Sequence, residues 1–245
     1  MRALLALAIA ALIPSSAVAA PTQVDAGQHP QQPLAPGGYG YQLFVPRGYV
    51  PDSKQARWPL MIFLHGSGER GSDLALVKVH GPPKKAEQEP GFPFVLISPQ
   101  LPAGVEAWDL SHLNAILDKA LKTLNVDRDR VYLTGLSRGA YGALDWALTN
   151  PDRFAAIALV AGRSDLPRAC ALKDMPTWFF HGDRDDTVDA RGSFDMHRAI
   201  RACGGQPRLT IYPDLGHNSW DPAYDDPALY LWLLKQRRPK QRIRR

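Results

Sequence analysis

Six short, mostly apolar runs of four or five residues limit the folds open to this chain more than any other feature. Such runs, bounded by glycine and proline, are typical of strands buried on both faces of a parallel sheet. Segments with apolar residues at helical spacing alternate with them. The runs are 60–64, 94–97, 131–134, 156–160, 177–180 and 209–212, and the helical segments are 113–124, 140–148, 194–200 and 229–234.

This alternation predicts an α/β fold, a mostly parallel doubly wound sheet, as one domain over residues 39–236 with no large lid. The first part of that domain, Tyr39–Val45, alternates apolar and polar residues, which indicates an antiparallel strand. Hydrophobic residues make up 45% of the chain, which excludes an intrinsically disordered protein.

The charged residues are distributed unevenly along the chain. There are 29 Lys and Arg against 24 Asp and Glu, a formal net charge of +5. Seven basic residues and no acid lie in the last eleven positions, and Arg2 adds one more, so the rest carries −3. A domain without a basic excess is not expected to bind nucleic acid. Residues 237–245 are expected to form a basic disordered tail, with weak binding to anionic lipid, cell-wall polymer or nucleic acid as the alternative.

Residues 1–20 have the features of a secretory signal peptide. A positive start precedes 11 unbroken apolar residues, and small residues follow that allow cleavage after Ala19 or Ala20. Eleven apolar residues are well short of the ~20 that span a bilayer, so no stable membrane insertion is expected. Residues 21–38 are rich in Pro, Gln, Gly and Ala, which predicts a linker. The mature protein is therefore expected in the periplasm or outside the cell.

The chain has only two cysteines, Cys170 and Cys203, on either side of the strand predicted near residue 177. Outside the cytoplasm they can form one intramolecular disulfide. Two free thiols are the alternative.

Among the motifs of the chain, Gly135-Leu136-Ser137-Arg138-Gly139 is the strongest indication of a catalytic site. This G-x-S-x-G pattern lies directly between a predicted strand and a predicted helix, where a sharp turn would present the Ser137 hydroxyl above the edge of the sheet. Glycines are needed on both sides because larger residues would collide in so tight a turn. Ser137 is therefore the candidate nucleophile.

A serine nucleophile needs a base, and the base needs an acid that orients it. His217 follows the last predicted strand and is the candidate base, whereas His65 and His181 sit in His-Gly pairs at strand ends and are expected to pack or form turns. Asp185 is the candidate acid, with Asp186 as the alternative that spacing cannot separate. The order Ser, Asp, His is the order found in α/β-hydrolases.

Backbone N–H groups must also face the oxyanion that forms on the substrate. The residue after the nucleophile, Arg138, supplies one. The glycine-rich loop at 65–71 supplies the other, from Ser67 or alternatively Gly68. A phosphate cradle is excluded as the function of this loop because the Walker Lys-Ser/Thr is missing.

The motifs H-G-S-G-E-R-G, G-L-S-R-G, H-G-D-R-D-D-T-V and G-H-N-S-W, with the late L-Y-x-W-L-L, give the chain a family resemblance. Over residues 37–236 it resembles the secreted "predicted peptidase" or phospholipase/carboxylesterase-like α/β-hydrolases, which are related to dienelactone hydrolase and to prolyl oligopeptidase catalytic domains. The resemblance implies Ser137 as nucleophile, His217 as base and Asp185 as acid. It favours Asp185 over Asp186 because the acid of the carboxylesterase branch is the fifth residue of the motif that starts at His181.

The sequence thus predicts a secreted serine esterase acting on small-molecule esters with short or aromatic acyl groups, and no metal or cofactor. Peptidase activity and a non-catalytic binding protein of the same fold are the alternatives. Trp108 and Trp220 either line the substrate pocket or pack in the core. Arg70 and Arg138 either bind an anionic substrate group or pair with a surface acid such as Glu69.

Overall fold

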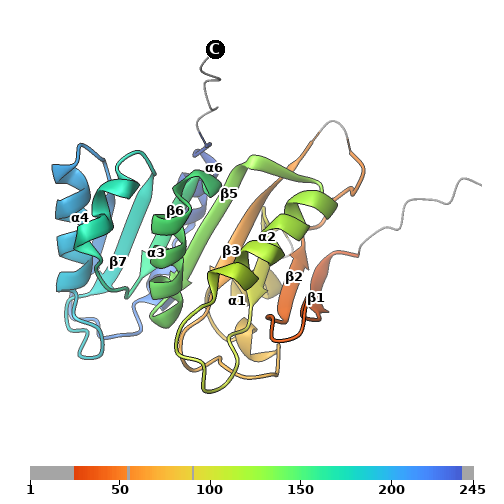
Figure 1. Cartoon of the computed structure of the whole chain (residues 1–245), viewed down its shortest axis with the longest axis horizontal. Helices are drawn as coiled ribbons and strands as arrows, with labels where there is room; N and C mark the ends of the chain where they lie inside the picture. Colours follow the sequence, from red (N-terminus) through yellow and green to blue (C-terminus); the bar gives the residue numbers. More distant parts are fainter. Residues whose placement is uncertain (1–24, 54–55, 90, 239–245) are drawn as a thin grey trace, which may run out of the picture.

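The computed structural model describes residues 25–53, 56–89 and 91–238 and contains one twisted eight-stranded sheet with helices on both faces (Figure 1). The strand order is β1-β2-β4-β3-β5-β6-β7-β8. Strands β3 to β8 run parallel, whereas β2 is antiparallel to both β1 and β4. The strands are β1 Gly27–Gln31, β2 Tyr41–Val45, β3 Trp58–Leu64, β4 Val95–Pro99, β5 Val126–Leu136, β6 Ala156–Val160, β7 Thr177–Gly182 and β8 Arg208–Tyr212. This is the doubly wound α/β architecture that the alternation of apolar runs predicts.

Two apolar clusters, one on each side of the sheet, hold the helices in place. In β3, Leu60 and Ile62 belong to one cluster and Met61 and Phe63 to the other, because successive side chains of a strand point to opposite faces. Helices α2, α3 and α4 contribute to the first cluster, and α1, α5 and α6 to the second. The helices are α1 Gly81–Gln88, α2 Leu110–Thr123, α3 Arg138–Thr149, α4 Arg191–Ala202, α5 Trp220–Asp225 and α6 Pro227–Leu234, with short 3-10 turns at Leu76–Lys78, Pro151–Arg153 and Leu166–Leu172.

Strand β1 corrects the prediction of a linker over residues 21–38. It lies inside that segment and pairs with β2 from Gly27↔Val45 to Gln31↔Tyr41. Its sequence, GQHPQ, has no apolar alternation, so the strand owes its existence to pairing with β2 at the edge of the sheet. The predicted cleavage site at Ala19 or Ala20 lies outside the described residues.

The start of the basic tail is also ordered where disorder was predicted. Arg237 lies 2.9 Å from the Asp127 carboxylate, and Arg238 lies 3.3 Å from that of Asp129. The Arg238 amide also donates to the Asp129 carbonyl at 2.8 Å. Two acids at the beginning of β5 therefore neutralise the first two tail arginines. Residues 239–245 lie outside the described part.

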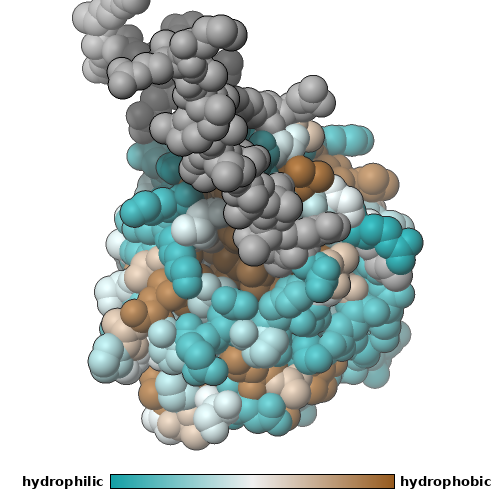
Figure 2. All heavy atoms as spheres, turned by 90° about the vertical axis from the view of Figure 1, so that its right-hand side faces the viewer, coloured by the Kyte–Doolittle hydropathy of each residue, from teal (hydrophilic) through white to brown (hydrophobic). Residues whose placement is uncertain are grey.

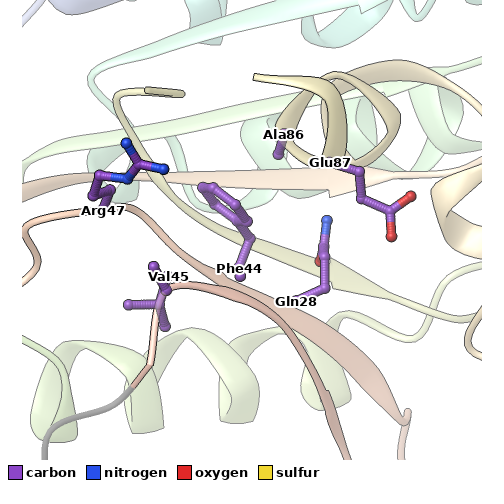
Figure 3. A pocket seen from close by; sticks show the side chains of 8 residues that line it. Gln28, Phe44, Val45, Arg47, Ala86 and Glu87 are labelled. Carbon is purple, nitrogen blue, oxygen red and sulfur yellow. The ribbon is translucent and has the colours of Figure 1, made fainter. Parts of the chain in front are cut away.

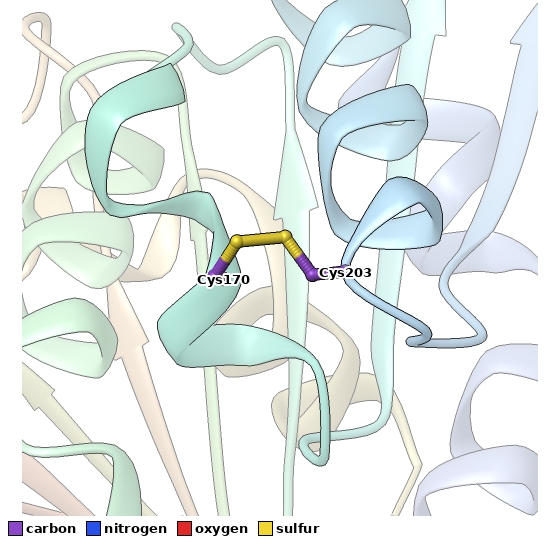
Figure 4. Close-up of a disulfide and its surroundings, with 2 residues drawn as sticks. All are labelled: Cys170 and Cys203. Atoms are coloured by element: carbon purple, nitrogen blue, oxygen red, sulfur yellow. A yellow bond between two sulfur atoms is a disulfide. The ribbon is translucent and has the colours of Figure 1, made fainter.

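Cys170 and Cys203 form a disulfide, 33 residues apart in sequence, with their Cα atoms 5.4 Å apart (Figure 4). Cys170 lies in the 3-10 turn that follows β6, and Cys203 is the residue after α4. The bond joins the two segments that flank β7, so it fixes α4 beside the loop that enters β7.

Figure 2 shows the side of the molecule where the first strands lie, and described residues are visible on part of it. Hydrophobic residues there form small separate areas among hydrophilic ones (Figure 2). Among the described residues, no helix has the length and apolar character needed to cross a bilayer.

Candidate active site

The backbone at Ser137 is held in a strained conformation, with φ 52° and ψ −119°. Ser137 is the single residue between β5 and α3, and its amide donates to the Val160 carbonyl of β6 at 2.9 Å. A side chain at Gly139 would overlap the backbone of Leu64 at the end of β3, and one at Gly135 would overlap Gly139. Both glycines are therefore required for the sharp turn that the sequence predicts at this serine.

The three residues predicted as a triad form a continuous chain of hydrogen bonds. His217 Nε2 lies 3.0 Å from Ser137 Oγ, and His217 Nδ1 lies 2.7 Å from Asp185 Oδ2. Because a carboxylate only accepts, Nδ1 carries the proton and Nε2 is free to accept the proton of the serine hydroxyl. This is the arrangement that a serine nucleophile with a histidine base requires.

The structure brings Asp185 to His217 and leaves Asp186 exposed. The Asp185 side chain is 0% exposed, and its Oδ1 accepts from the amides of Thr187 and Val188 at 3.0 and 2.8 Å. Burial raises the pKa of Asp185, but the hydrogen bonds from His217 and from these amides outweigh burial and lower it. Asp185 is therefore held as an anion beside the imidazole.

The loops that carry Asp185 and His217 meet because Gly182 has no side chain. A Cβ atom at Gly182 would overlap the carbonyl oxygens of Leu215 and Gly216, on the loop after β8. The amide of Arg184 donates to the Leu215 carbonyl at 3.0 Å. This close approach of the two backbones sets the distance between acid and base.

The predicted oxyanion donors, the amides of Ser67 and Arg138, have no hydrogen-bond partner among the described residues. The loop that holds Ser67 is instead fixed through its other polar atoms. Arg70 Nε donates to the Ser67 carbonyl at 3.0 Å, and Arg138 Nε donates to the Ser67 hydroxyl at 2.7 Å. Both amides are thus available to a ligand while the Ser67 peptide is restrained.

Glu106 joins these two arginines and was not predicted from the sequence. Its carboxylate lies 2.8 Å from the guanidinium of Arg70 and 2.8 Å from that of Arg138. The hydrogen bond from Arg70 and the charge of Arg138 lower the pKa of Glu106. Neither arginine pairs with Glu69, and both are occupied by Glu106, which argues against their binding an anionic substrate group. We call Arg70, Arg138, Glu106 and Ser67 the arginine bridge.

His65 is a structural residue of the Ser67 loop, as its His-Gly pair predicts. It is 0% exposed, its Nδ1 donates to the Gly66 carbonyl at 2.6 Å, and its Nε2 accepts from the Leu101 amide at 2.9 Å. Burial lowers the pKa of His65 to about 4, so the ring is neutral at pH 7.

The two predicted pocket tryptophans have different surroundings. Trp108 is 7% exposed and packs edge-on against Tyr39 and His65 with centroids 5.5 and 5.1 Å apart, which favours a packing role. Trp220 is half-buried and packs edge-on against His217 at 5.2 Å. His80, which no motif indicated, also packs against Trp220, with the ring centroids 5.7 Å apart. Trp220 is therefore the aromatic side chain that touches the candidate base.

A cavity of about 390 Å³ lies away from these residues, at the β1 edge of the sheet (Figure 3). Strands β1 and β2 and helix α1 supply its walls. Its lining residues are Ala26, Gly27, Gln28, Phe44, Val45, Arg47, Ala86 and Glu87. None of the triad candidates lines it. In the described ranges, no cluster of three or more His, Cys, Asp or Glu side chains could hold a metal ion.

Replacing Glu106 tests the arginine bridge. In Glu106→Ala both arginines lose their shared partner, so we expect kcat/KM on an ester to fall roughly two- to five-fold at low salt. Salt screens exposed ion pairs, so the difference from wild type should shrink as NaCl is raised. Glu87→Ala, which removes a surface ion pair with Lys78, is the matched control. An unchanged kcat/KM in Glu106→Ala at low salt would contradict this part of the account.

The low pKa of His65 predicts how stability depends on pH. Between pH 6.5 and about 4 the unfolded chain binds a proton at His65 that the folded chain does not. The free energy of unfolding should therefore fall by up to ~3 kcal/mol as pH decreases through that window. Urea denaturation at several pH values should show a smaller fall in His65→Gln. His112→Gln, on α2, measures the general effect of losing a histidine, and an equal slope in wild type and His65→Gln would refute the assignment.

Comparison with known proteins identifies the family. Residues 97–227 match the Phospholipase/Carboxylesterase family. The chain is 26% identical over 213 residues to the bifunctional acetylxylan esterase/xylanase of Neocallimastix patriciarum, covering 81% of this chain and 30% of that protein. It is 26% identical over 204 residues to feruloyl esterase B of Neurospora crassa, covering 75% of this chain and 67% of that protein. The crystal structure of a thermostable esterase shares 29% identity and a TM-score of 0.73 over 86% of this chain and 63% of that one.

This chain thus spans less than a third of the first relative and about two thirds of the second. The family match covers more than half of the chain and includes Ser137, Asp185 and His217. Together with the α/β-hydrolase architecture, it shows that the chain belongs to the phospholipase/carboxylesterase family.

Proposed function

We propose that this protein is an esterase that hydrolyses carboxylic esters through an acyl-enzyme, with Ser137 as nucleophile, His217 as general base and Asp185 as the acid that orients it. The observation that carries the proposal is the unbroken chain of hydrogen bonds from Ser137 Oγ through both nitrogens of His217 to Asp185, at 3.0 and 2.7 Å. Such a chain lets the hydroxyl lose its proton as it attacks, without a metal or cofactor.

In the first half of the reaction, Ser137 Oγ bonds to the carbonyl carbon of the ester while His217 Nε2 takes the hydroxyl proton. The carbonyl oxygen becomes an oxyanion, which the free amides of Ser67 and Arg138 stabilise. The N-terminus of α3 adds a positive field at the same place. The protonated His217 then gives its proton to the alcohol oxygen as the ester C–O bond breaks.

In the second half, water replaces the alcohol. His217 takes a proton from the water, and the resulting hydroxide attacks the acyl carbon of the Ser137 ester. Asp185 stays ionised throughout and stabilises the imidazolium that forms twice in the cycle. As the second tetrahedral intermediate collapses, the bond to Ser137 Oγ breaks, His217 returns its proton to that oxygen, and the carboxylic acid is released.

The proposed substrates are esters with short or aromatic acyl groups. Two relatives are named for acetylxylan and feruloyl esters, a short and an aromatic acyl group. The edge-on contact between Trp220 and His217 supports an aromatic group next to the reacting carbonyl. Esters are preferred to amides because an alcohol leaves more readily than an amine.

We further propose that the protein acts in the periplasm or outside the cell. The signal-peptide pattern of residues 1–20 supports this location. The disulfide between Cys170 and Cys203 supports it too, because such bonds persist in oxidising compartments.

Labelling with a fluorophosphonate probe tests the proposed nucleophile. The wild-type protein should be labelled covalently and lose its esterase activity in parallel, since the probe reacts with an activated serine. Ser137→Ala should show neither labelling nor activity above background. Ser164→Ala, a serine on the loop after β6, serves as the matched control and should behave as wild type.

Labelling of Ser137→Ala at the wild-type rate would reject Ser137 as the nucleophile. A panel of acetyl, feruloyl and longer acyl esters, each with its matched amide, tests the substrate class. Faster turnover of the amides would favour a peptidase instead.

A further inference from the structure

A second histidine contacts the Asp185 carboxylate. His181, on β7, is 0% exposed, and its Nε2 lies 3.1 Å from Asp185 Oδ2, the oxygen that also accepts from His217. The same Nε2 lies 2.9 Å from the Val188 carbonyl. The sequence placed His181 in a His-Gly pair and predicted only packing or a turn, so this contact was not expected.

The surroundings of His181 fix its tautomer. Both neighbours of Nε2 are acceptors, a carboxylate and a carbonyl, so Nε2 must carry a proton. Nδ1 lies 2.8 Å from the hydroxyl of Ser193, in the first turn of α4, which is 1% exposed. In the neutral ring Nδ1 accepts from that hydroxyl. Every polar atom of the ring then has a partner, as a fully buried imidazole requires.

These contacts tie the acid to β7 and α4 as well as to the base. His217, on the loop after β8, donates a hydrogen bond to Asp185 Oδ2, and His181, on β7, donates to the same oxygen. Val188 and Ser193 link His181 to the loop and to α4. Without His181, the carboxylate would keep only the amides of its own loop and His217.

We propose that His181 is a positioning residue of the catalytic centre: its Nε2–H holds Asp185 for His217 and takes up part of the carboxylate's negative charge. This inference rests on the proposed function. Because a hydrogen bond from His181 weakens the carboxylate as an acceptor, losing it should strengthen the interaction of Asp185 with the His217 imidazolium. His181 itself exchanges no proton with substrate.

Other titratable groups around the two histidines stay the same in the variants compared. Tyr141 on α3 interacts electrostatically with Asp185 and with Arg138. Asp189 interacts with His181 and is paired with Arg191. His80 packs against Trp220 and lies 3.7 Å from the Glu69 carboxylate.

Three variants of β7 separate positioning from packing. His181→Leu has no donor, whereas His181→Gln keeps an amide N–H that can reach the position of Nε2. Phe180→Leu is the matched control, since Phe180 is equally buried on β7 but packs on the opposite face of the sheet. The measurements are kcat and KM on an ester from pH 5 to 9, the rate of fluorophosphonate labelling, and the folded fraction by circular dichroism.

We expect His181→Leu to lower kcat and the labelling rate roughly 10- to 100-fold with little change in KM, as for a lost hydrogen bond to a buried charge. In this variant, the fall of kcat/KM at acid pH, which reports protonation of His217, should occur at a higher pH than in the wild type. We call this part of the pH profile the acid limb. His181→Gln should recover most of both effects, and Phe180→Leu should lower stability without moving the limb.

Full activity in folded His181→Leu would overturn the inference. The inference would also be overturned if the activity of His181→Leu fell only in proportion to its folded fraction, the acid limb of kcat/KM stayed at the wild-type pH, and His181→Gln recovered no activity. The two proposals fail separately: equal labelling of wild type and Ser137→Ala rejects the nucleophile, whereas Ser137-dependent labelling that His181→Leu leaves unchanged rejects only the positioning residue.

Discussion

The close crossing of the first turn of α3 over the end of β3 is the constraint on which the proposed active site depends. Gly139 lies against the Leu64 backbone, and the chain between β5 and α3 must turn within Ser137. The positive φ of Ser137 costs on the order of 1–3 kcal/mol, which the packing of α3 on the sheet must offset. Because of this turn, the Ser137 hydroxyl and the Arg138 amide are fixed next to the end of β3, where the loop that contains Ser67 begins.

The parallel sheet brings the remaining groups to this point because strands β3, β5, β7 and β8 end at the same edge. Each loop is then held by its own buried contacts. His65 fixes the loop after β3, and His181 and two amides fix Asp185 after β7. The proposed reacting atoms therefore lie on loops whose backbones are restrained by buried contacts, which keeps the proposed serine nucleophile, base and acid at fixed distances.

The sequence is sufficient for the parts of this site that depend on local rules. Ser137 and His217 follow predicted strands within recognisable motifs, and the structure joins them. Asp185 and Asp186 could not be separated by spacing, because the choice depends on which carboxylate accepts the amides of the following turn. Glu106 lies in a loop without a motif, and its contacts with Arg70 and Arg138 exist only after β3, β4 and β5 are aligned. Strand β1 and helix α1 were missed because their apolar periodicity is weak and pairing or packing stabilises them.

We propose above all that Ser137 attacks an ester carbonyl whose oxyanion is bound by the amides of Ser67 and Arg138. A crystal structure of the protein inhibited by an organophosphonate tests this most directly. We expect phosphorus bonded to Ser137 Oγ and the phosphoryl oxygen about 3 Å from both amide nitrogens. Phosphorus bonded to another residue, or a phosphoryl oxygen that contacts neither amide, would contradict it.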